Sequence, residues 1–496
     1  PPRLLARPGP VLLRMAGPRL GALLSHGWSF CPPVRPPTTF RLGTGSALRW
    51  SATEASATAA ATSPQSPLRD VPGDRPMLRM TARHKTEKGG DARVAKRVPW
   101  IFRDEVDNFE DLLKRGAGKA ALLVNVESSE GRELGIAAFN LHRGVNIVAR
   151  MLSDNVAVSI DQAFFEGRIR RALEHRELFF AGSAHHRLLN AEGDFVPGVL
   201  CDRYDQALCI QFTSAAMEAL FEKQVVDALH AVLSPQAIVR RCDVLNDRTM
   251  EFAPIYPPAV LRGQYSGPTR FTESGFTFHT DLLEEAGCSG RVFEDRPLRA
   301  LLARQLAVRD AGDVSGLRGL ALFSESLGIL CASRGVQTTC GVVGAGADGG
   351  TGATRAHLER LADRNGCAER VSFLELEEEA SVALLRSGCP EGYDIVTLEP
   401  PAFAPTYGRV EEGMRKYTAW VAAAAGAMKP GGLLLVVCRS RTMSPVRLLR
   451  CINLAIWSLG RRAEVVHRCA AAPGDFPIHI GLPDTGQFQA MMLRVH

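Results

Sequence analysis

The C-terminal part of the chain, residues 280–496, alternates short apolar runs with segments of helical periodicity, and this alternation constrains the fold most. The apolar runs are residues 319–324, 338–343, 371–376, 393–399 and 431–437. Residues 354–366 and 415–428 show helical spacing between them. Strands that alternate with helices predict an α/β domain with a doubly wound sheet. In such a sheet, ligands bind where the strands end.

The fourth apolar run ends in a stiff loop that carries an acid and an aromatic ring. Residues 393–405 read YDIVTLEPPAFAP, so Glu399 is followed by Pro400, Pro401 and Phe403. Two prolines cannot continue a strand ladder and they limit the loop's conformations. A rigid loop of this kind can hold a flat heterocycle, with the carboxylate against its polar edge. We therefore predict a heterocycle pocket at these four residues.

The charge of the chain is concentrated at its start. Residues 1–53 contain seven arginines and no acidic residue, whereas the whole chain has 59 basic and 53 acidic residues. The remainder, with 52 basic against 53 acidic residues, is near neutral, so any nucleic-acid contact must come from local patches. The leader's arginine-rich, acid-free composition favours an organelle transit peptide, mitochondrial rather than plastid. A disordered tail, or sequence upstream of a true start at Met15, is the alternative.

Four segments follow from the local patterns. We expect a transit peptide and low-complexity linker at residues 1–92, with the folded body beginning near Arg93. Short apolar strands predict a small β-barrel at residues 93–160. A helix that starts after Asp161 opens a central α+β domain at residues 161–279. Residues 280–496 form the doubly wound domain.

Cysteine spacing and hydropathy exclude two classes of protein. The twelve cysteines include no C-x-x-C pair, so we expect neither a zinc site nor a disulfide framework. No run of eighteen apolar residues is present, so we expect no membrane span.

Four segments, in this order, resemble the RlmI-like family of large-subunit ribosomal RNA cytosine-5 methyltransferases. They are residues 98–106 (VPWIFRDEV), 186–205 (HRLLNAEGDFVPGVLCDRYD), 288–296 (CSGRVFEDR) and 398–403 (LEPPAF). The resemblance implies a PUA domain that binds RNA, a central domain and a class I methyltransferase domain of Rossmann-like fold. It also implies S-adenosylmethionine as cofactor and large-subunit ribosomal RNA as partner, with ribosomal proteins as further partners.

The predicted cofactor loop departs from the family pattern. Where the family has an acid, a glycine and a ribose-binding acid, this chain has Ala321, Leu327 and Val343. Leucine places a side chain where glycine permits close backbone approach. The positions that keep cofactor-binding candidates are Phe323, Ser324, Gly328 and Arg296. Residues 344–349 (GAGADG) formally match a dinucleotide motif, but they follow the second strand rather than the first, which makes a second nucleotide site improbable.

The predicted nucleophile is also displaced. The family chemistry needs a cysteine thiolate that adds to the pyrimidine ring. Here Arg439 stands at that position and Cys438 one residue earlier. Because side chains alternate faces along a strand, Cys438 would point away from the pocket unless the strand bulges. Otherwise Cys438 is a buried strand-end cysteine.

These departures leave two main hypotheses. The first is an RNA-binding protein that has lost methyl transfer and acts on organellar large-subunit RNA as an assembly factor or ribosome-associated protein. The second is an active S-adenosylmethionine-dependent methyltransferase that uses Cys438 and Glu399. A metabolic enzyme with a nucleotide on residues 344–349 is a distant third. The candidate RNA contacts are Arg97, Trp100, Arg103, Arg143, Arg150 and, at the base pocket, Arg439. Trp100 could equally be barrel core.

Overall fold

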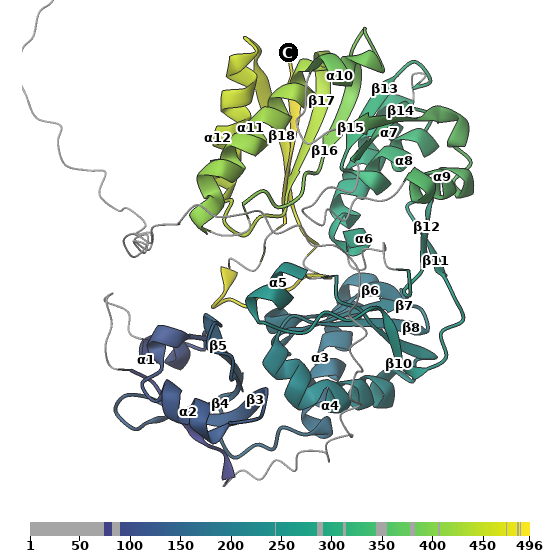
Figure 1. Ribbon diagram of the computed structural model, residues 1–496. Coiled ribbons are helices and arrows are strands. Elements are labelled where there is room, and N and C mark those ends of the chain that lie inside the picture. Colours follow the sequence, from purple (N-terminus) through teal and green to yellow (C-terminus); the bar gives the residue numbers. More distant parts are fainter. Residues whose placement is uncertain are drawn as a thin grey trace, which may run out of the picture. The chain divides into compact units, whose positions relative to one another are not determined.

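The computed structural model describes residues 74–81, 90–243, 245–284, 291–310, 314–343, 355–376, 382–404, 407–472, 474–483, 486 and 488–496 (Figure 1). The chain divides into two units, Pro1–Gln65 and Ser66–His496, and every described residue belongs to the second. The predicted transit segment and residues 344–349 therefore lie outside the described residues.

The first described domain is a five-stranded sheet with the strand order β1-β3-β4-β5-β2. Its elements are β1 (Met77–Arg79), α1 (Gly90–Ala95), β2 (Trp100–Phe102), α2 (Phe109–Arg115), β3 (Ala121–Glu127), β4 (Glu133–Asn140) and β5 (Ile147–Ser153). All neighbouring strands run antiparallel except β1 and β3. The core of this domain includes Val124 and Phe139, which are fully buried.

This domain begins earlier than its sequence suggested. Strand β1 pairs with β3, Leu78 is fully buried in the same core, and Met80 is only 1% exposed. The expected start near Arg93 was therefore wrong for the barrel. A three-residue strand next to a low-complexity segment is too short to show a periodic pattern, which is why the sequence did not reveal it.

The central domain is a second five-stranded sheet with the order β10-β9-β8-β7-β6. Its elements are α3 (Gln162–Phe180), β6 (His185–Asn190), the 3-10 turn η3 (Ala191–Asp194), β7 (Val199–Tyr204), β8 (Ala207–Phe212), α4 (Ala215–Leu233), β9 (Ala237–Arg240), α5 (Leu245–Met250) and β10 (Ala259–Gly263). Asp161 caps α3, because its carboxylate accepts a hydrogen bond from the Phe164 amide at 3.0 Å. Helix α4 connects β8 to β9, the parallel pair of this sheet. A hairpin of β11 (Thr269–Glu273) and β12 (Phe276–Thr280) follows.

The C-terminal domain holds the predicted doubly wound sheet, with the strand order β15-β14-β13-β16-β17-β19-β18. Its strands are β13 (Arg318–Leu322), β14 (Gln337–Val343), β15 (Val371–Leu376), β16 (Tyr393–Leu398), β17 (Met428–Cys438), β18 (Ala463–Ala470) and β19 (Gln489–Val495). Its helices are α6 (Arg291–Glu294), α7 (Arg296–Asp310), α8 (Glu325–Ser333), α9 (Arg355–Arg364), α10 (Val382–Ser387), α11 (Val410–Gly426) and α12 (Pro445–Ser458).

The sheet of this domain has a topological switch point that positions the candidate site. Strands β13 to β17 are parallel, and β19 is antiparallel to its two neighbours. From β13 the chain proceeds outward to β14 and β15, then returns to β16 on the other side. The loops after β13 and β16 therefore open side by side at the carboxyl edge, where doubly wound sheets bind ligands. The predicted α/β class is confirmed.

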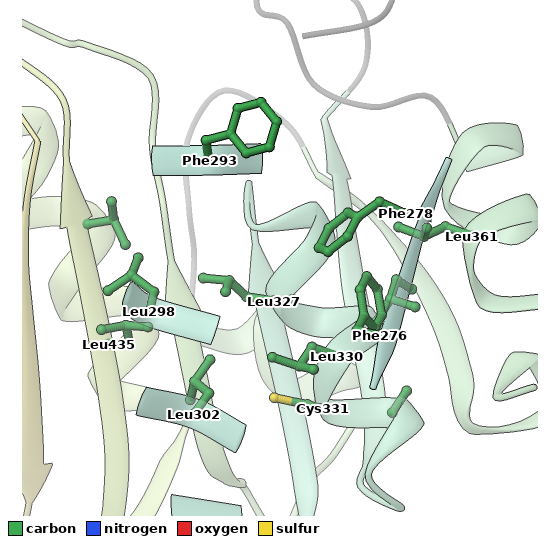
Figure 2. Close-up of a cluster of buried hydrophobic side chains, with 14 of the residues drawn as sticks. Phe276, Phe278, Phe293, Leu298, Leu302, Leu327, Leu330, Cys331, Leu361 and Leu435 are labelled. Atoms are coloured by element: carbon green, nitrogen blue, oxygen red, sulfur yellow. The ribbon is translucent and has the colours of Figure 1, made fainter. Parts of the chain in front are cut away.

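Two apolar layers cover the two faces of this sheet. One layer includes the α7 and α8 residues Leu302 and Leu330, together with Phe276 and Phe278 of the hairpin (Figure 2). The other includes Tyr417 of α11 and Cys451 of α12. In the part of the chain that the structure describes, no helix combines the length and apolarity that a membrane crossing requires.

Candidate functional site

Glu399 and Arg439 come together at the carboxyl edge of the sheet. Each directly follows a strand, β16 for Glu399 and β17 for Arg439, and these two strands are parallel neighbours. The Arg439 guanidinium donates to Oε1 of Glu399 from Nε at 3.0 Å and from Nη2 at 2.6 Å. The Glu399 side chain is 4% exposed, so this ion pair is buried. The predicted heterocycle acid is therefore occupied by a side chain of the same chain.

Two further carboxylates complete the pairing of Arg439. Nη2 donates to Oδ1 of Asp295 at 2.5 Å, and Nη1 donates to Glu294. The guanidinium also lies over the ring of Phe488, with 4.9 Å to its centroid. Burial alone would lower the pKa of Arg439, but Glu399, Asp295 and Glu294 outweigh it and hold that pKa well above its ordinary value. We call this group the Arg439 cluster.

Of the three acids in the Arg439 cluster, the sequence predicted a role only for Glu399. Glu294 and Asp295 belong to residues 288–296, the stretch in which the family normally reads Asp-Gln at these two positions. Asp295 therefore stands where the family resemblance gives glutamine. This extra carboxylate is the sequence feature that could have indicated a nearby cation such as Arg439. The interpretation of Arg439 as a phosphate ligand is wrong, because three carboxylates already surround it.

Cys438 lies on the opposite face of β17. Residues Leu433, Leu435 and Val437 belong to one apolar layer, whereas Leu434, Val436 and Cys438 belong to the other. The pairing of β17 with β19 stays in register through Cys438, so no bulge turns the thiol. Cys438 is fully buried, and its Sγ lies 3.4 Å from the Tyr417 hydroxyl. Burial raises the pKa of this thiol, which disfavours the thiolate that nucleophilic attack requires.

The loop after Glu399 packs against α11 instead of standing open. Tyr417 donates from its hydroxyl to the Pro401 carbonyl at 3.3 Å, and the ring of Phe403 meets that of Tyr417 edge-on at 5.2 Å. Pro400 is buried and Pro401 is exposed. Phe403 therefore has a packing role that accounts for its aromatic ring.

The predicted cofactor loop is filled by packing. Leu327 is fully buried in the apolar layer between the sheet and α7, and Figure 2 shows it among Leu298, Phe278 and Leu330. A Cβ on Gly328 would lie 2.5 Å from the Cβ of Ala321. Gly328 is thus required for close packing of α8 on β13, rather than for approach to a ligand.

Ser324 and Phe323 also have local partners. Ser324 is 2% exposed, and its hydroxyl donates to the Leu322 carbonyl at 3.3 Å. The Phe323 ring meets Trp420 edge-on at 4.7 Å. The side chain of Val343 lies outside the described residues.

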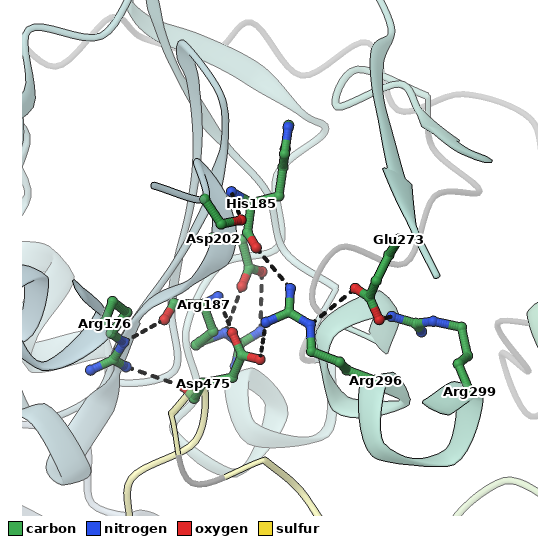
Figure 3. Close-up of polar contacts among 9 residues, drawn as sticks. Arg176, His185, Arg187, Asp202, Glu273, Arg296, Arg299 and Asp475 are labelled. Atoms are coloured by element: carbon green, nitrogen blue, oxygen red, sulfur yellow. Dashed lines mark hydrogen bonds and ion pairs between the residues drawn. The ribbon is translucent and has the colours of Figure 1, made fainter. Parts of the chain in front are cut away.

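Arg296 joins domains and does not line the cofactor loop. It donates to Glu273 of the hairpin at 3.0 Å, to Asp475 at 2.7 Å and to the His185 carbonyl of the central domain at 2.8 Å (Figure 3). Two arginines of the central domain also bind Asp475. Arg176 donates from Nη2 to the Asp475 carbonyl at 3.1 Å, and the Arg187 amide donates to Oδ1 of Asp475 at 3.0 Å. The prediction that Arg296 binds the cofactor is therefore wrong, because its guanidinium is fully engaged in this buried ion network.

Three of the candidate RNA-binding arginines are exposed on the first domain. The Arg97 side chain is 80% exposed and pairs with Asp154 at 3.1 Å, and that of Arg143 is 66% exposed and pairs with Glu110 at 2.7 Å. Arg103 is exposed and donates to the carbonyl of Arg143. These three cations remain accessible to a phosphate.

Trp100 and Arg150 form contacts between the first domain and the central domain. Arg150 is 6% exposed and contacts Glu192 of η3 at 3.3 Å and Glu251, which follows α5, at 2.6 Å. Trp100 donates from Nε1 to Glu192 at 2.8 Å. A direct phosphate contact by Arg150 is therefore excluded by its burial between two carboxylates. The two residues instead fasten the first domain to the central domain.

The described residues contain no group of three or more His, Cys, Asp or Glu side chains that could hold a metal ion.

Comparison with known proteins shows which proteins this chain is similar to. A family profile described as "PUA-like domain" matches residues 87–154. The "Ribosomal RNA large subunit methyltransferase I" of Pseudoalteromonas translucida is 28% identical over 421 residues, which cover 84% of this chain and 100% of that protein. The protein of the same name from Shewanella amazonensis is 27% identical with the same coverage. The chain thus resembles these RlmI proteins over most of its length.

Solved structures agree with the RlmI-like fold. A protein of Streptococcus mutans described as a SAM-dependent methyltransferase superposes with a TM-score of 0.64 at 15% identity, covering 84% of this RlmI-like chain and all of that one. A methyltransferase structure complexed with SAH gives a TM-score of 0.62 at 16% identity and covers 85% and 99% of the two chains. The departures at Ala321, Leu327 and Arg439 therefore stand within a retained three-domain scaffold.

Proposed function

We propose that this RlmI-like protein binds large-subunit ribosomal RNA and does not methylate it. The RNA is suggested by the name of the curated relatives, whose full length the chain covers. A PUA-like first domain with exposed arginines supports the same partner. The acid-free, arginine-rich leader supports a mitochondrial location, with a plastid as the alternative.

The Arg439 cluster is the observation that supports a loss of methyl transfer. A guanidinium stays protonated and offers no lone pair, so it cannot add to a pyrimidine ring as a thiolate does. Its pairing with Glu399 also removes the acid that the family resemblance assigns to the base. The neighbouring thiol of Cys438 lies on the other face of the strand. Nucleophile and acid are thus both unavailable.

The residues around the cofactor loop do not fit S-adenosylmethionine. Ala321 provides no carboxylate, and Leu327 occupies the glycine position with a fully buried side chain. Gly328 and Ser324 are both explained by internal contacts.

The test is methyl transfer by the full chain. Large-subunit RNA is incubated with labelled S-adenosylmethionine, while RNA binding and cofactor binding are measured separately by anisotropy and calorimetry. We expect RNA binding without methyl incorporation. The alternative is an active methyltransferase, which the name of the relatives favours. Turnover that disappears in Cys438→Ser would establish that alternative, and absence of RNA binding would also overturn the proposal.

A further inference from the structure

The last residue of α5 and the segment that follows it present three large apolar side chains to the surface. Met250 is 49%, Phe252 52% and Ile255 60% exposed, whereas Glu251 and Ala253 are buried between them. Large exposed apolar residues that lie close together often mark an interaction site. Buried and exposed side chains thus alternate along this segment, so the segment packs against the protein while its large apolar side chains face solvent.

Buried polar contacts hold this segment in place. Arg248 is fully buried and donates to the Pro254 carbonyl at 2.8 Å and to the Phe212 carbonyl at 2.8 Å. Glu251 accepts from Arg150 at 2.6 Å, and its carbonyl accepts from Asn140 at 3.2 Å. Phe252 is therefore fixed on both sides, by the central domain and by the first domain.

Phe252 adopts a conformation that a large residue rarely takes. Its φ is +54°, in the left-handed region, which is strained for a residue with a Cβ. Strain of this kind persists where the surroundings impose it, and it is concentrated at functional sites. Here the contacts of Arg248 and Glu251 impose it, and the result is an outward aromatic ring.

The Phe252 ring is backed by an imidazole. The rings of His142 and Phe252 stack at 3.8 Å between centroids with 18° between their planes. His142 is itself oriented, because its Nδ1 accepts from the Gly144 amide at 3.1 Å. A Cβ on Gly144 would lie 2.6 Å from Cζ of Phe252, so glycine lets this loop lie against the ring. One face of the Phe252 ring thus lies on His142, while 52% of the residue's surface stays exposed.

Cations border this stacked pair. Arg143 separates His142 from Gly144 and is exposed, and Arg103 donates to the carbonyl of Arg143. A flat aromatic surface beside exposed arginines suits a nucleic-acid strand, whose bases stack on rings while its phosphates meet cations. A partner surface that is apolar throughout offers these arginines no counter-charge, whereas the RNA phosphates do.

We propose that the His142–Phe252 pair is a stacking platform for an unpaired base of single-stranded RNA, and that Arg150 is its positioning residue. This rests on the proposed function and assigns the RNA contact to residues that the sequence did not indicate. Arg150 contributes indirectly, by holding Glu251 and so the strained Phe252.

The experiment compares full-length variants in binding to a fluorescent single-stranded RNA of twelve nucleotides and to the matching duplex. Phe252→Ala should weaken single-strand binding about fivefold or more, as loss of one base–aromatic stack does. Phe252→Trp should retain the affinity. The matched control is Phe179→Ala, because Phe179 of α3 is an aromatic of similar exposure, 54%, that also neighbours a histidine, His175, at 5.0 Å. This control should bind like the unmodified protein.

Salt dependence separates stacking from charge. Phe252→Ala should leave the slope of log affinity against log salt unchanged, whereas Arg143→Gln should reduce it by about one. Arg150→Met, if folded by circular dichroism, should weaken single-strand binding as Phe252→Ala does. Equal single-strand affinity of Phe252→Ala and Phe179→Ala would overturn the platform while leaving the proposed function intact. A protein that binds neither RNA would overturn both.

Discussion

The Nη2 atom of Arg439 lies 2.6 Å from Oε1 of Glu399, at the ends of two neighbouring parallel strands. In an RlmI-like scaffold this ion pair occupies the place where the family resemblance puts the nucleophile and the base-binding acid. The pair also joins Glu294 and Asp295 at the start of the domain to the sheet. The Arg439–Glu399 pair is thus a structural connection, and its contribution to the stability of the domain can be measured.

Removing Arg439 should destabilise the C-terminal domain. Arg439→Met leaves Glu399 and Asp295 buried without their counter-ion, and such a change costs about 3–5 kcal/mol. Urea unfolding followed by tryptophan fluorescence measures it. The control is Arg409→Met, which breaks an exposed pair with Glu412 at 3.3 Å and should cost less than about 1 kcal/mol. Similar costs for the two variants would contradict a buried cluster.

Cys438 should be unreactive in the folded protein. Alkylation requires a thiolate, and burial both hides this thiol and raises its pKa. Iodoacetamide treatment at neutral pH, followed by mass spectrometry of peptides, should modify Cys438 only after denaturation. Cys469, which is partly exposed, provides the internal comparison. Rapid labelling of native Cys438 would show that the strand end opens and would reinstate it as a candidate nucleophile.

Restoring the family's glycine should be costly. Leu327→Gly removes a fully buried leucine, which costs about 2–5 kcal/mol, and places glycine in a helix, which costs about 1 more. Leu178→Gly is the matched control, since Leu178 lies in helix α3 but is 82% exposed. Thermal unfolding distinguishes the two variants.

The quadruple variant Ala321→Asp, Leu327→Gly, Val343→Asp and Arg439→Cys should regain S-adenosylmethionine binding, measured by calorimetry. Because Leu327→Gly is destabilising, this binding is expected only in preparations that remain folded.

The start of the first domain can be located by truncation. Deleting residues 1–73 should leave the melting temperature unchanged, because β1 is retained. Deleting residues 1–92 removes Leu78 and Met80 from the core and should lower the melting temperature or prevent folding. Differential scanning fluorimetry of both truncations checks this. Equal stability of the two would show that β1 contributes nothing to the sheet.

His186 should make the protein less stable in mild acid. Burial, with nearby arginines, lowers the pKa of His186 to about 3, whereas it is about 6.5 in an unfolded chain. The unfolded state therefore binds more protons between these values, so stability falls as pH drops below about 6.5. At pH 5 the loss is about 2 kcal/mol. His186→Phe should remove this loss relative to pH 8, and an unchanged pH dependence would refute the assignment.

Strands and a helix N-cap could be predicted from the sequence. The strands that end at Leu322, Leu398 and Cys438 follow from apolar runs, and the helix cap at Asp161 follows from residue type. Alternation along a strand also predicted that Cys438 and Arg439 face opposite sides, because side chains alternate with a fixed period. Such features depend on neighbours in sequence, so composition and spacing suffice to find them.

The roles of single side chains depended on tertiary contacts. Arg150 and Arg296 resemble surface ligands in the sequence, yet Arg150 meets Glu192, 42 residues away, and Arg296 meets Asp475, 179 residues away. Phe252 gave no signal at all, because its strain and its stack on His142 arise from a contact between domains. The identity of a charged or aromatic residue does not reveal whether its side chain is buried or exposed. Only folding decides which partner neutralises it, since that partner is brought from a distant part of the chain.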